Sequence, residues 1–296
     1  MRVFVTGATG FVGSLVVKEL IAASHQVIGV YRSDDKAQAL AVAGAEPYRG
    51  SIDDPDSLKE GAARSDGVIH LAFNHDFSKF AANCETDNRV VKALVSVLAD
   101  SHRPLIVTSG TAIARVPPGT PATEDAPPIS SRDFPRAASE EACADAAAQG
   151  VNASVVRLPQ VHDPERQGLI SPWIAIAREK GVFAYVGEGE NRWPAAHVSD
   201  VARLYRLAVE KAERHAIYNA VAEEGVKARH IAETIARRLK LPVKSMTPEE
   251  AEPYFGWLAH FVARDMPASS AHTRKKLGWE PTGPGLIADL ERLSVS

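Results

Sequence analysis

The stretch VFVTGATGFVGSLVVKEL near the start of the chain constrains the fold more than any other feature. It places three glycines between an apolar strand pattern and an amphipathic helix pattern. In such a turn the first glycine permits a tight bend, the second lets backbone amides approach a pyrophosphate, and the third lets helix and strand pack closely. The helix N-terminus then offers free amides and a partial positive charge to the anion. We therefore expect a dinucleotide to bind at Gly7, Thr9, Gly10, Phe11, Val12 and Gly13.

Short apolar runs alternate with helical patterns through the first half of the chain. The expected strands have the sequences RVFVTG, QVIGVY, GVIHLAF, PLIVTSG and ASVVRLP, and helix-like stretches separate them. Continuous apolar strands separated by helices are typical of a parallel sheet covered on both faces. The predicted fold class is α/β, with a doubly wound parallel sheet of the Rossmann type.

The sequence changes in character after Pro159, where loops rich in Pro and Gly begin. Its patterns predict helices near residues 171–180, 199–213 and 227–239, a hairpin across residues 183–197, and one more strand at IYNAV. We expect a smaller C-terminal substrate lobe. The predicted division gives residues 1–162 and 193–222 to the dinucleotide-binding domain and residues 163–192 and 223–296 to the lobe.

Composition excludes several classes of partner. The chain has 296 residues, 45% of them hydrophobic, which is enough for one large domain with an appended lobe. A net charge of -3 gives no field that would attract nucleic acid or an anionic membrane. Cys84 and Cys143 stand far apart and fit a reducing compartment, and no apolar run is long enough to cross a membrane. We expect a cytoplasmic protein that acts on a small molecule.

The end of the second strand, VIGVYRSDDKAQ, bears on the choice between the two nicotinamide cofactors. An acidic residue there accepts from the ribose 2′-hydroxyl of NAD, whereas an arginine pairs with the 2′-phosphate of NADP. Tyr31 occupies the expected position of the acid, and Arg32 and Ser33 follow it. We predict NADP. The alternative is NAD, with a solvated Arg32 and with Asp34 or Asp35 on the ribose.

TGATGFVG is the TGxxGxxG form of the turn, and VIHLAF, VTSGT, VVRLPQVHDP, HVSDVA and RKKLGWEP follow it in order. With this ordered set, nearly the whole chain resembles the extended short-chain dehydrogenase/reductase family, the relatives of the NAD-dependent epimerases and dehydratases. The resemblance implies a nicotinamide cofactor and, by analogy, a homodimer formed through helices of the main domain. It also implies cofactor contacts from Ser51 and Ile52 near the adenine, from Ala72 and Phe73 beyond the fourth strand, and from Pro159 near the nicotinamide.

The active-site pattern of this family is incomplete in the chain. Family members use a Ser or Thr after the fifth strand and a Tyr-x-x-x-Lys pair at the next helix, where the Lys holds the nicotinamide ribose and the Tyr carries the proton. Ser109 and Thr111 supply the first element, but no Tyr is followed by Lys four positions later. The pair falls near Arg132 and Arg136 instead. This resembles an atypical subgroup with His-x-x-x-Arg spacing, although Arg132 departs from its histidine.

Arginine does not replace tyrosine as an acid, because its pKa above about 12 keeps it protonated. It can donate fixed hydrogen bonds and a permanent charge to an anion or a developing alkoxide. We assign Arg136 the role of the lysine toward the ribose, and Arg132 a role facing an anion. Because Pro135 suits only a first helical turn, Asp133 is the expected N-cap, and Arg132 then lies off the helical face of Arg136. The alternative is that both arginines are surface residues without a role.

A histidine is the expected proton carrier in place of the tyrosine, since its unperturbed pKa suits neutral pH. His162, in RLPQVHDP, leads because the corresponding family segment passes beside the nicotinamide. His75 and His197 come next, and His70 is predicted to be a packed strand residue. A structural or solvated role is the alternative for each. No metal-binding spacing occurs among the ten histidines, so we expect no metal site.

Two later segments bear on the substrate. Arg192 and Trp193 stand at the border of the second lobe, where sugar-nucleotide relatives place an arginine on a substrate phosphate; a solvated arginine and a core tryptophan are the alternatives. PYFGWLAHF, residues 253–261, is the densest aromatic run and belongs to the lobe expected to cover the substrate. If this run lines the pocket rather than the core, the substrate is apolar or aromatic.

Two hypotheses of function follow. The first is an NADPH-dependent oxidoreductase that transfers hydride between the nicotinamide and a small carbonyl or hydroxyl substrate. Ser109 or Thr111 would bind the substrate oxygen, Arg136 the cofactor, and His162 or water would handle the proton. The second is a non-catalytic NADP-binding sensor or regulator that has lost the tyrosine, and a sugar-nucleotide epimerase or dehydratase is a further alternative.

Overall fold

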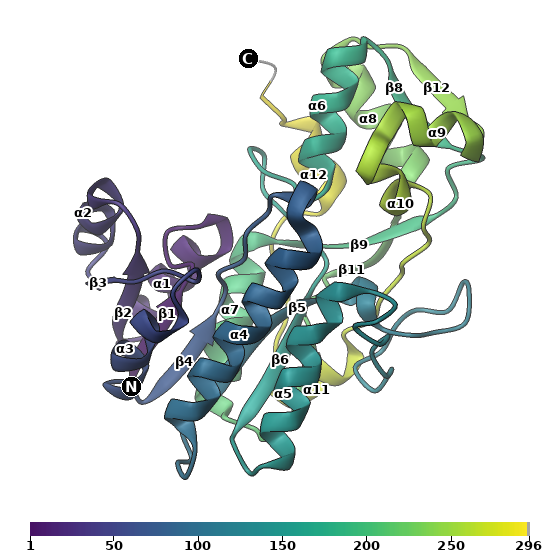
Figure 1. Ribbon diagram of the computed structural model, residues 1–296. Helices are drawn as coiled ribbons and strands as arrows, with labels where there is room; N and C mark the ends of the chain where they lie inside the picture. The colour runs from purple at the N-terminus through teal and green to yellow at the C-terminus, as the bar shows by residue number, and fades with distance from the viewer. Residues whose placement is uncertain (295–296) are drawn as a thin grey trace.

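We describe residues 1–294 of the protein in a computed structural model (Figure 1). The main domain is built on seven strands: β1 (Arg2–Thr6), β2 (Gln26–Tyr31), β3 (Glu46–Arg49), β4 (Gly67–His70), β5 (Leu105–Gly110), β6 (Ala153–Leu158) and β10 (Ile217–Asn219). Their order across the sheet is β10-β6-β5-β4-β1-β2-β3, and every neighbouring pair is parallel. The predicted doubly wound α/β fold is confirmed. The direction of winding reverses between β1 and β4, where the carboxyl ends of the strands leave a crevice for a ligand.

Helices cover both faces of this sheet because alternate strand residues are apolar on both sides. In β1, Val3 and Val5 belong to the core shared with the first helix, whereas Phe4 packs in the core on the other face. On one face, α4 (Phe80–Leu98) and α5 (Ala138–Ala148) lie side by side (Figure 1). The helices of the main domain are α1 (Phe11–Ala22), α2 (Asp34–Val42), α3 (Lys59–Ala63), α4 (Phe80–Leu98), α5 (Ala138–Ala148), α7 (Val198–Lys211) and α11 (Ala271–Leu277).

The second lobe has its own core of large apolar side chains, among them the fully buried Trp173, Trp193 and Phe183. Its elements are α6 (Ile170–Lys180), β8 (Phe183–Val186), α8 (Ala228–Leu239), β12 (Val243–Met246), α9 (Pro248–Phe255), α10 (Ala259–Val262) and α12 (Leu286–Glu291). A three-stranded sheet contributes to both parts of the molecule; it contains β7 (Gln160–His162), β9 (Arg192–His197) and β11 (Glu223–Lys227). The domain boundaries expected from the sequence stay a prediction.

Short 3-10 helices stand in the loops that lead to the carboxyl edge of the main sheet and in the second lobe. They are η1 (Pro55–Leu58), η2 (Phe77–Lys79), η3 (Thr111–Ile113), η4 (Pro135–Ala137) and η5 (Gly256–Leu258). Two of them, η2 and η5, carry aromatic residues that matter below.

The predicted hairpin across residues 183–197 is wrong. The strands exist, but β8 pairs in parallel with β12, whereas β9 lies between β7 and β11. Gly187 and Gly189, both at positive φ, turn the connecting segment from one sheet to the other. An apolar pattern predicts that a segment is a strand, but its partner depends on residues elsewhere in the chain. The helices expected nearby are observed as α6, α7 and α8.

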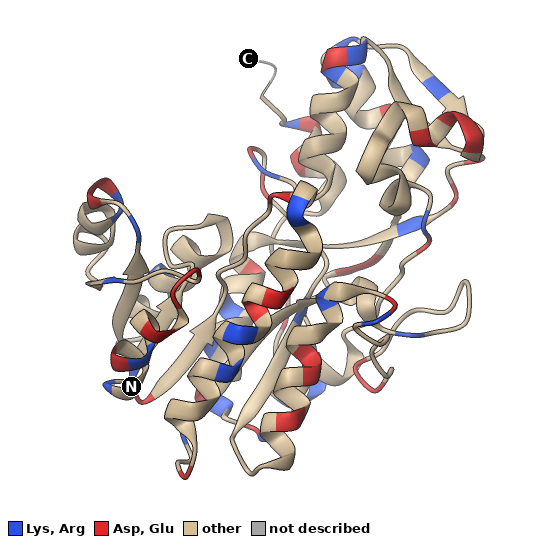
Figure 2. Cartoon of the chain, in the orientation of Figure 1, with Lys and Arg blue, Asp and Glu red and all other residues tan. Residues whose placement is uncertain are grey.

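Charged residues of both signs are interspersed over the main domain and the second lobe (Figure 2). None of the helices within residues 1–294 is both long and apolar enough to span a bilayer.

Candidate active site

A cavity of about 1120 Å³ lies along the carboxyl ends of β1 to β6 and extends to the second lobe. It contacts the glycine turn after β1 and reaches Trp257, Phe261 and Met266 in the lobe. Typical small-molecule pockets measure roughly 300–1,000 Å³. The cavity therefore has room for a dinucleotide together with a small substrate.

The glycine turn forms one end of this cavity, and all six residues predicted there line it. Gly7 has φ +67°, and an added Cβ would lie 2.8 Å from the backbone nitrogen of Ala72. At Gly13, an added Cβ would lie 2.0 Å from the carbonyl oxygen of Gly7. The N-cap of α1 is Gly10, which makes no side-chain hydrogen bond to the first turn. The first-turn amides are therefore left for an anion, as a pyrophosphate site requires.

The ends of β2 and β3 line the next part of the cavity. This part of the cavity is lined by Tyr31, Arg32 and Ser33, the residues expected to bear on the choice of cofactor. Lys36 of α2 lines it as well. Arg32 forms no ion pair with any other residue between positions 1 and 294. Asp34 and Asp35 do not line the cavity, and Ser33 donates a hydrogen bond to Asp35. Arg32 and Lys36 therefore face the cavity. Asp34 and Asp35, the acids that the NAD alternative places on the ribose, do not.

The remaining predicted cofactor contacts also line the cavity. They are Ser51 and Ile52 after β3, Ala72 and Phe73 after β4, and Pro159 after β6. The Ala72 amide donates to the Thr6 hydroxyl at 3.2 Å, which ties the loop after β4 to the end of β1. These residues form one continuous wall, although their contacts with a cofactor stay a prediction.

Ser109 and Thr111, at the end of β5, both line the cavity. The Ser109 side chain is 4% exposed, and its hydroxyl has no hydrogen-bond partner among the described residues. The Thr111 hydroxyl makes only a long contact of 3.4 Å with the Leu158 carbonyl oxygen. Buried polar atoms are nearly always paired, so an unpaired hydroxyl at a cavity wall points to a ligand oxygen.

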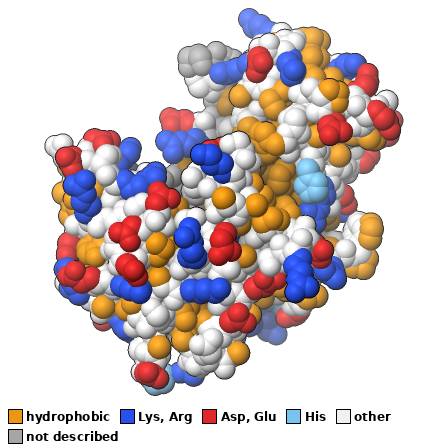
Figure 3. Space-filling model, viewed as in Figure 1, with side chains coloured by type: hydrophobic (Ala, Val, Ile, Leu, Met, Phe, Trp, Pro, Cys, Tyr) orange, Lys and Arg blue, Asp and Glu red, His pale blue; other side chains and the backbone are white. Residues whose placement is uncertain are grey.

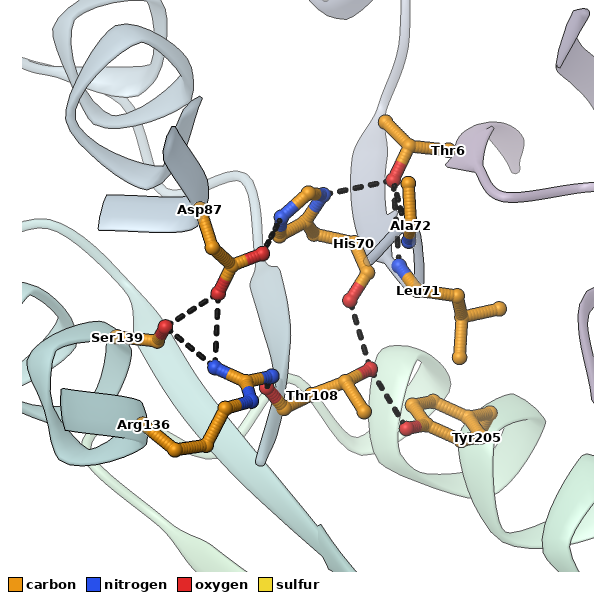
Figure 4. Close-up of polar contacts among 9 residues, drawn as sticks. All are labelled: Thr6, His70, Leu71, Ala72, Asp87, Thr108, Arg136, Ser139 and Tyr205. Atoms are coloured by element: carbon orange, nitrogen blue, oxygen red, sulfur yellow. Dashed lines mark hydrogen bonds and ion pairs between the residues drawn. The ribbon is translucent and has the colours of Figure 1, made fainter. Parts of the chain in front are cut away.

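Arg136 lines the cavity and is held in place by four groups, three of which, on Asp87, Ser139 and Thr108, are drawn in Figure 4. Its Nη1 donates to Asp87 Oδ2 at 2.9 Å and to Ser139 Oγ at 2.6 Å. Its Nη2 donates to the Thr108 carbonyl oxygen at 2.8 Å, and its Cζ lies 4.5 Å from the centre of the Phe73 ring. The guanidinium is therefore fixed beside the backbone that carries Ser109.

Asp87 joins Arg136 to the centre of the sheet. Its Oδ1 lies 2.9 Å from His70 Nε2, and His70 Nδ1 lies 2.7 Å from the Thr6 hydroxyl (Figure 4). Burial acts to raise the pKa of the Asp87 carboxyl, but the charge of Arg136 and the hydrogen bond of His70 outweigh it and hold the pKa at about 2. His70 is a buried residue of β4, as predicted. The buried Asp87 carboxylate is thus paired with Arg136 through one oxygen and with His70 through the other.

Arg132 lies outside the cavity, which corrects its predicted role. Its side chain is exposed in the turn before η4, and its backbone amide donates to Ser130 Oγ. Pro135 stands at the start of η4 with Phe134 as the N-cap, so the prediction that Asp133 caps this helix is wrong. The proline fixes the turn so that only Arg136 of the two arginines reaches the cavity.

His162 does not line the cavity either, and its predicted role as the proton donor is corrected. Its side chain is fully buried, and Nδ1 lies 2.8 Å from Asp289 Oδ2. Burial lowers the pKa of His162 despite the opposing effect of Asp289. His197 lies beside it in the sheet and caps α7 through a hydrogen bond with Ser199. Both histidines serve the junction of β7, β9 and α12 rather than the cavity.

His75 is the one histidine that lines the cavity among the residues described. It follows Phe73 in the loop after β4, and their ring centres lie 5.3 Å apart. Desolvation by neighbouring groups and the charge of Arg136 lower the pKa of His75, although the residue is exposed to solvent along the cavity. The imidazole is therefore neutral near pH 7 and can accept a proton there.

The part of the cavity between the main domain and the lobe is aromatic. Trp257 and Phe261, from the predicted aromatic run, line it, whereas Phe255 of the same run belongs to the core. Trp193 is a fully buried core residue. Arg192 does not line the cavity, because Asp265 binds its guanidinium at 2.8 Å. Arg192 and Trp193 therefore have structural roles, Arg192 as the ion-pair partner of Asp265 and Trp193 as a core residue.

Sequence reasoning missed several residues of this site. Lys36 could have been found, since a cation four residues after Arg32 falls on the first turns of the next helix. The position of Asp87 carries no local signal, because Arg136 lies 49 residues away in sequence. The aromatic residues Phe77 in η2, Phe80 at the start of α4 and Phe134 before η4 also line the cavity, and no recognisable motif marks them.

Comparisons with known proteins agree with this geometry. The model of the NAD dependent epimerase/dehydratase family matches residues 3–221. An uncharacterized protein of Schizosaccharomyces pombe is 46% identical over 98% of each chain. The UDP-glucose 4-epimerase of Streptomyces lividans is 30% identical over 95% of this chain and 92% of its own.

A solved structure has the same fold. The dTDP-glucose 4,6-dehydratase DesIV of Streptomyces venezuelae, with NAD and TYD bound, superposes with a TM-score of 0.77 at 19% identity, over 99% of this chain and 95% of that one. The likeness in fold covers both the main domain and the lobe. Together with the family match, it confirms the resemblance predicted from the ordered motifs. The chain therefore belongs to the NAD-dependent epimerase/dehydratase family.

Proposed function

We propose that the protein is an NADPH-dependent oxidoreductase that interconverts a carbonyl and a hydroxyl group on a small substrate. One observation carries this proposal: the buried Ser109 hydroxyl at the cavity wall has no partner among residues 1–294. The fixed guanidinium of Arg136 binds the carbonyl of the adjacent Thr108. The backbone beside Ser109 is thus held rigidly, so the hydroxyl would be fixed in position to donate to a developing alkoxide.

The residues along the cavity fit a nicotinamide dinucleotide. Any Cβ at Gly13 would collide with the turn, and the first-turn amides of α1 remain for a pyrophosphate. Arg32, Ser33 and Lys36 favour the 2′-phosphate of NADP, and this preference is part of the proposal. When bound, the nicotinamide supplies or accepts the hydride.

The side chains of the site divide the rest of the chemistry. Ser109 would hydrogen-bond the substrate oxygen and orient the carbonyl carbon. Arg136 would keep the role predicted from the sequence, donating hydrogen bonds to the nicotinamide ribose, and it does not titrate, since arginine stays protonated. His75 faces the same cavity and has a lowered pKa, so it would accept or deliver the proton directly or through water.

The epimerase alternative is less well supported by the substrate end of the cavity. The Lys and Arg residues that line the cavity, within residues 1–294, are Arg32, Lys36 and Arg136. Arg32 directly follows β2 and Lys36 lies in the first turn of α2. Arg136 is already paired with Asp87. No further cation is free there for the pyrophosphate of a sugar nucleotide.

NADPH oxidation by the purified protein, measured over a panel of ketones and aldehydes, tests the proposal. Ser109→Ala should lower kcat on any active substrate by about 10² to 10³. The Kd for NADPH should stay unchanged. Ser96→Ala, on the exposed face of α4, is the matched control and should change neither value. Tight NADPH binding without turnover of any carbonyl compound would favour the non-catalytic sensor.

A further inference from the structure

Six aromatic side chains form a cluster at the end of the cavity that faces the second lobe. The cluster consists of Phe73, Phe77, Phe80, Phe134, Trp257 and Phe261. Their rings follow one another at contact distances, for example 5.6 Å between the centres of Phe80 and Phe134 and 6.3 Å between Trp257 and Phe261. On the face shown in Figure 3, hydrophobic side chains gather where the lobe meets the main domain.

Phe77 and Trp257 make the most regular contact of this cluster. Their ring centres lie 4.2 Å apart and their planes differ by 9°. Phe77 belongs to η2 in the main domain and Trp257 to η5 in the lobe, so the stacked pair bridges the two parts of the molecule across the cavity. Because the stacked rings cover one face of each other, the surface that the pair offers to a ligand is the part of the Trp257 indole left exposed.

The exposure of Trp257 indicates that this surface is incomplete. Trp257 is 43% exposed, whereas Trp173, Trp193 and Trp279 are fully buried. Apolar area left in water is unfavourable. A planar ring bound in the cavity would cover the exposed indole and add stacking contacts.

The charges around the cluster define the substrate further. Arg136 lies against Phe73, with its Cζ 4.5 Å from the ring centre, but Asp87 neutralises it. Arg192 is bound by Asp265 and by the Gly119 carbonyl oxygen. The cluster thus offers flat apolar surface and one fixed donor group, and residues 1–294 place no cation there that is free for a phosphate.

We infer that the substrate is a flat, uncharged aromatic carbonyl compound whose ring binds in the aromatic cluster, against Trp257 and Phe77, with its carbonyl oxygen at Ser109. This inference rests on the proposed function. In the reaction the carbonyl carbon gains the hydride, and the electron pair of the C=O π bond moves to oxygen, which gains a proton. NADPH is oxidised to NADP⁺, and the product is a secondary or primary alcohol.

Acetophenone and cyclohexyl methyl ketone provide the test, because they share a methyl ketone and a six-membered ring and differ in aromaticity. The wild type should show a kcat/KM for acetophenone about tenfold above that for the saturated ketone, which corresponds to about 1.4 kcal/mol. Trp257→Leu should bring this ratio close to one, whereas Trp257→Phe should keep most of it. Val243→Ala, at another exposed apolar residue in β12, should leave the ratio unchanged.

Binding of the same two ketones to the NADP⁺-loaded protein, measured by saturation-transfer NMR, separates this inference from the proposed function. Binding of acetophenone that depends on Trp257, without turnover, would support the aromatic site and reject the oxidoreductase. Equal turnover of both ketones in wild type and Trp257→Leu would reject the aromatic site and keep the oxidoreductase. Absence of acetophenone binding up to its solubility limit would also overturn the inference.

Discussion

The two ends of the cavity are built on different principles. At the glycine turn the wall is backbone, contributed by consecutive residues 7–13, and its shape depends on Cβ atoms that are absent. At the aromatic cluster the wall is made of side chains from residues 73–80, 134 and 257–261. Changes at the first end should therefore act through steric collision, whereas changes at the second should adjust affinity by degrees. Arg136 lies between the two ends, where it forms an ion pair with Asp87 and packs against the ring of Phe73.

The steric character of the first end is tested by Gly13→Ala. The new Cβ would lie 2.0 Å from the Gly7 carbonyl oxygen, so the backbone of the turn must move. Displacements of about 1 Å can cost about a hundredfold in a positioned site, and we expect the Kd for NADPH to rise by at least that factor. Fluorescence titration measures it.

Gly110→Ala is the matched control for this comparison, because its added Cβ would meet the Leu158 carbonyl oxygen at an ordinary 3.8 Å. NADPH binding should be nearly unchanged in that variant. Equal Kd values for wild type and Gly13→Ala would show that the turn does not hold the cofactor.

Arg136→Ala should have the largest effect on stability. It leaves the Asp87 carboxylate, which is 2% exposed, without its counter-charge. Breaking a buried ion pair in this way costs about 3–5 kcal/mol in free energy of unfolding. Arg136→Lys retains a charge and should lose less. Urea denaturation at pH 7 measures both, and a loss below about 1 kcal/mol in Arg136→Ala would contradict the charge network.

The same network predicts a pH dependence. The pKa of Asp87 is about 2 in the folded protein, against 3.8 for an unperturbed carboxyl. Because the folded value is lower, its contribution of about 2 kcal/mol is present above pH 3.8 and is lost as the pH falls through 2. The difference in unfolding free energy between wild type and Asp87→Asn should therefore shrink between pH 4 and pH 2, and a constant difference would reject this assignment.

The choice of cofactor should respond to Arg32. If its guanidinium binds the 2′-phosphate, Arg32→Ala should raise the Kd for NADPH about tenfold and leave the Kd for NADH unchanged, since one charge-assisted hydrogen bond is worth about 1.5–3 kcal/mol. Arg89→Ala, on the exposed side of α4, is the control. Preference of the wild type for NADH would instead support the NAD alternative.

The smallest expected effect concerns His75. Reduction needs a protonated donor, and the pKa of His75 is lowered by partial desolvation and by the charge of Arg136. The rate of carbonyl reduction should therefore rise a few-fold as the pH falls through a value below 6.5. His75→Gln should remove this dependence, whereas the exposed His230→Gln on α8 should retain it. An unchanged pH profile in His75→Gln would assign the proton to water or another group.

The fold and the residues that line the glycine-turn end of the cavity were largely predictable from the sequence. Gly7, Gly10 and Gly13 form a turn whose geometry depends on neighbouring residues, and the apolar strand runs predict a parallel sheet without knowledge of its contacts. The lack of a Tyr-x-x-x-Lys pair is likewise a property of the sequence. These features are local, so the residues that cause them lie next to one another in the chain.

Only the tertiary structure decided which candidate side chains reach the cavity. Arg136 and His75 line it, whereas Arg132 lies on the surface and His162 is buried against Asp289, 127 positions away in sequence. The tertiary structure also decided which strands pair with the two strands in residues 183–197. It decided as well which side chains of the aromatic run at residues 253–261 line the cavity. Burial, charge pairing and strand pairing depend on groups that are distant in the chain and meet only in the folded protein.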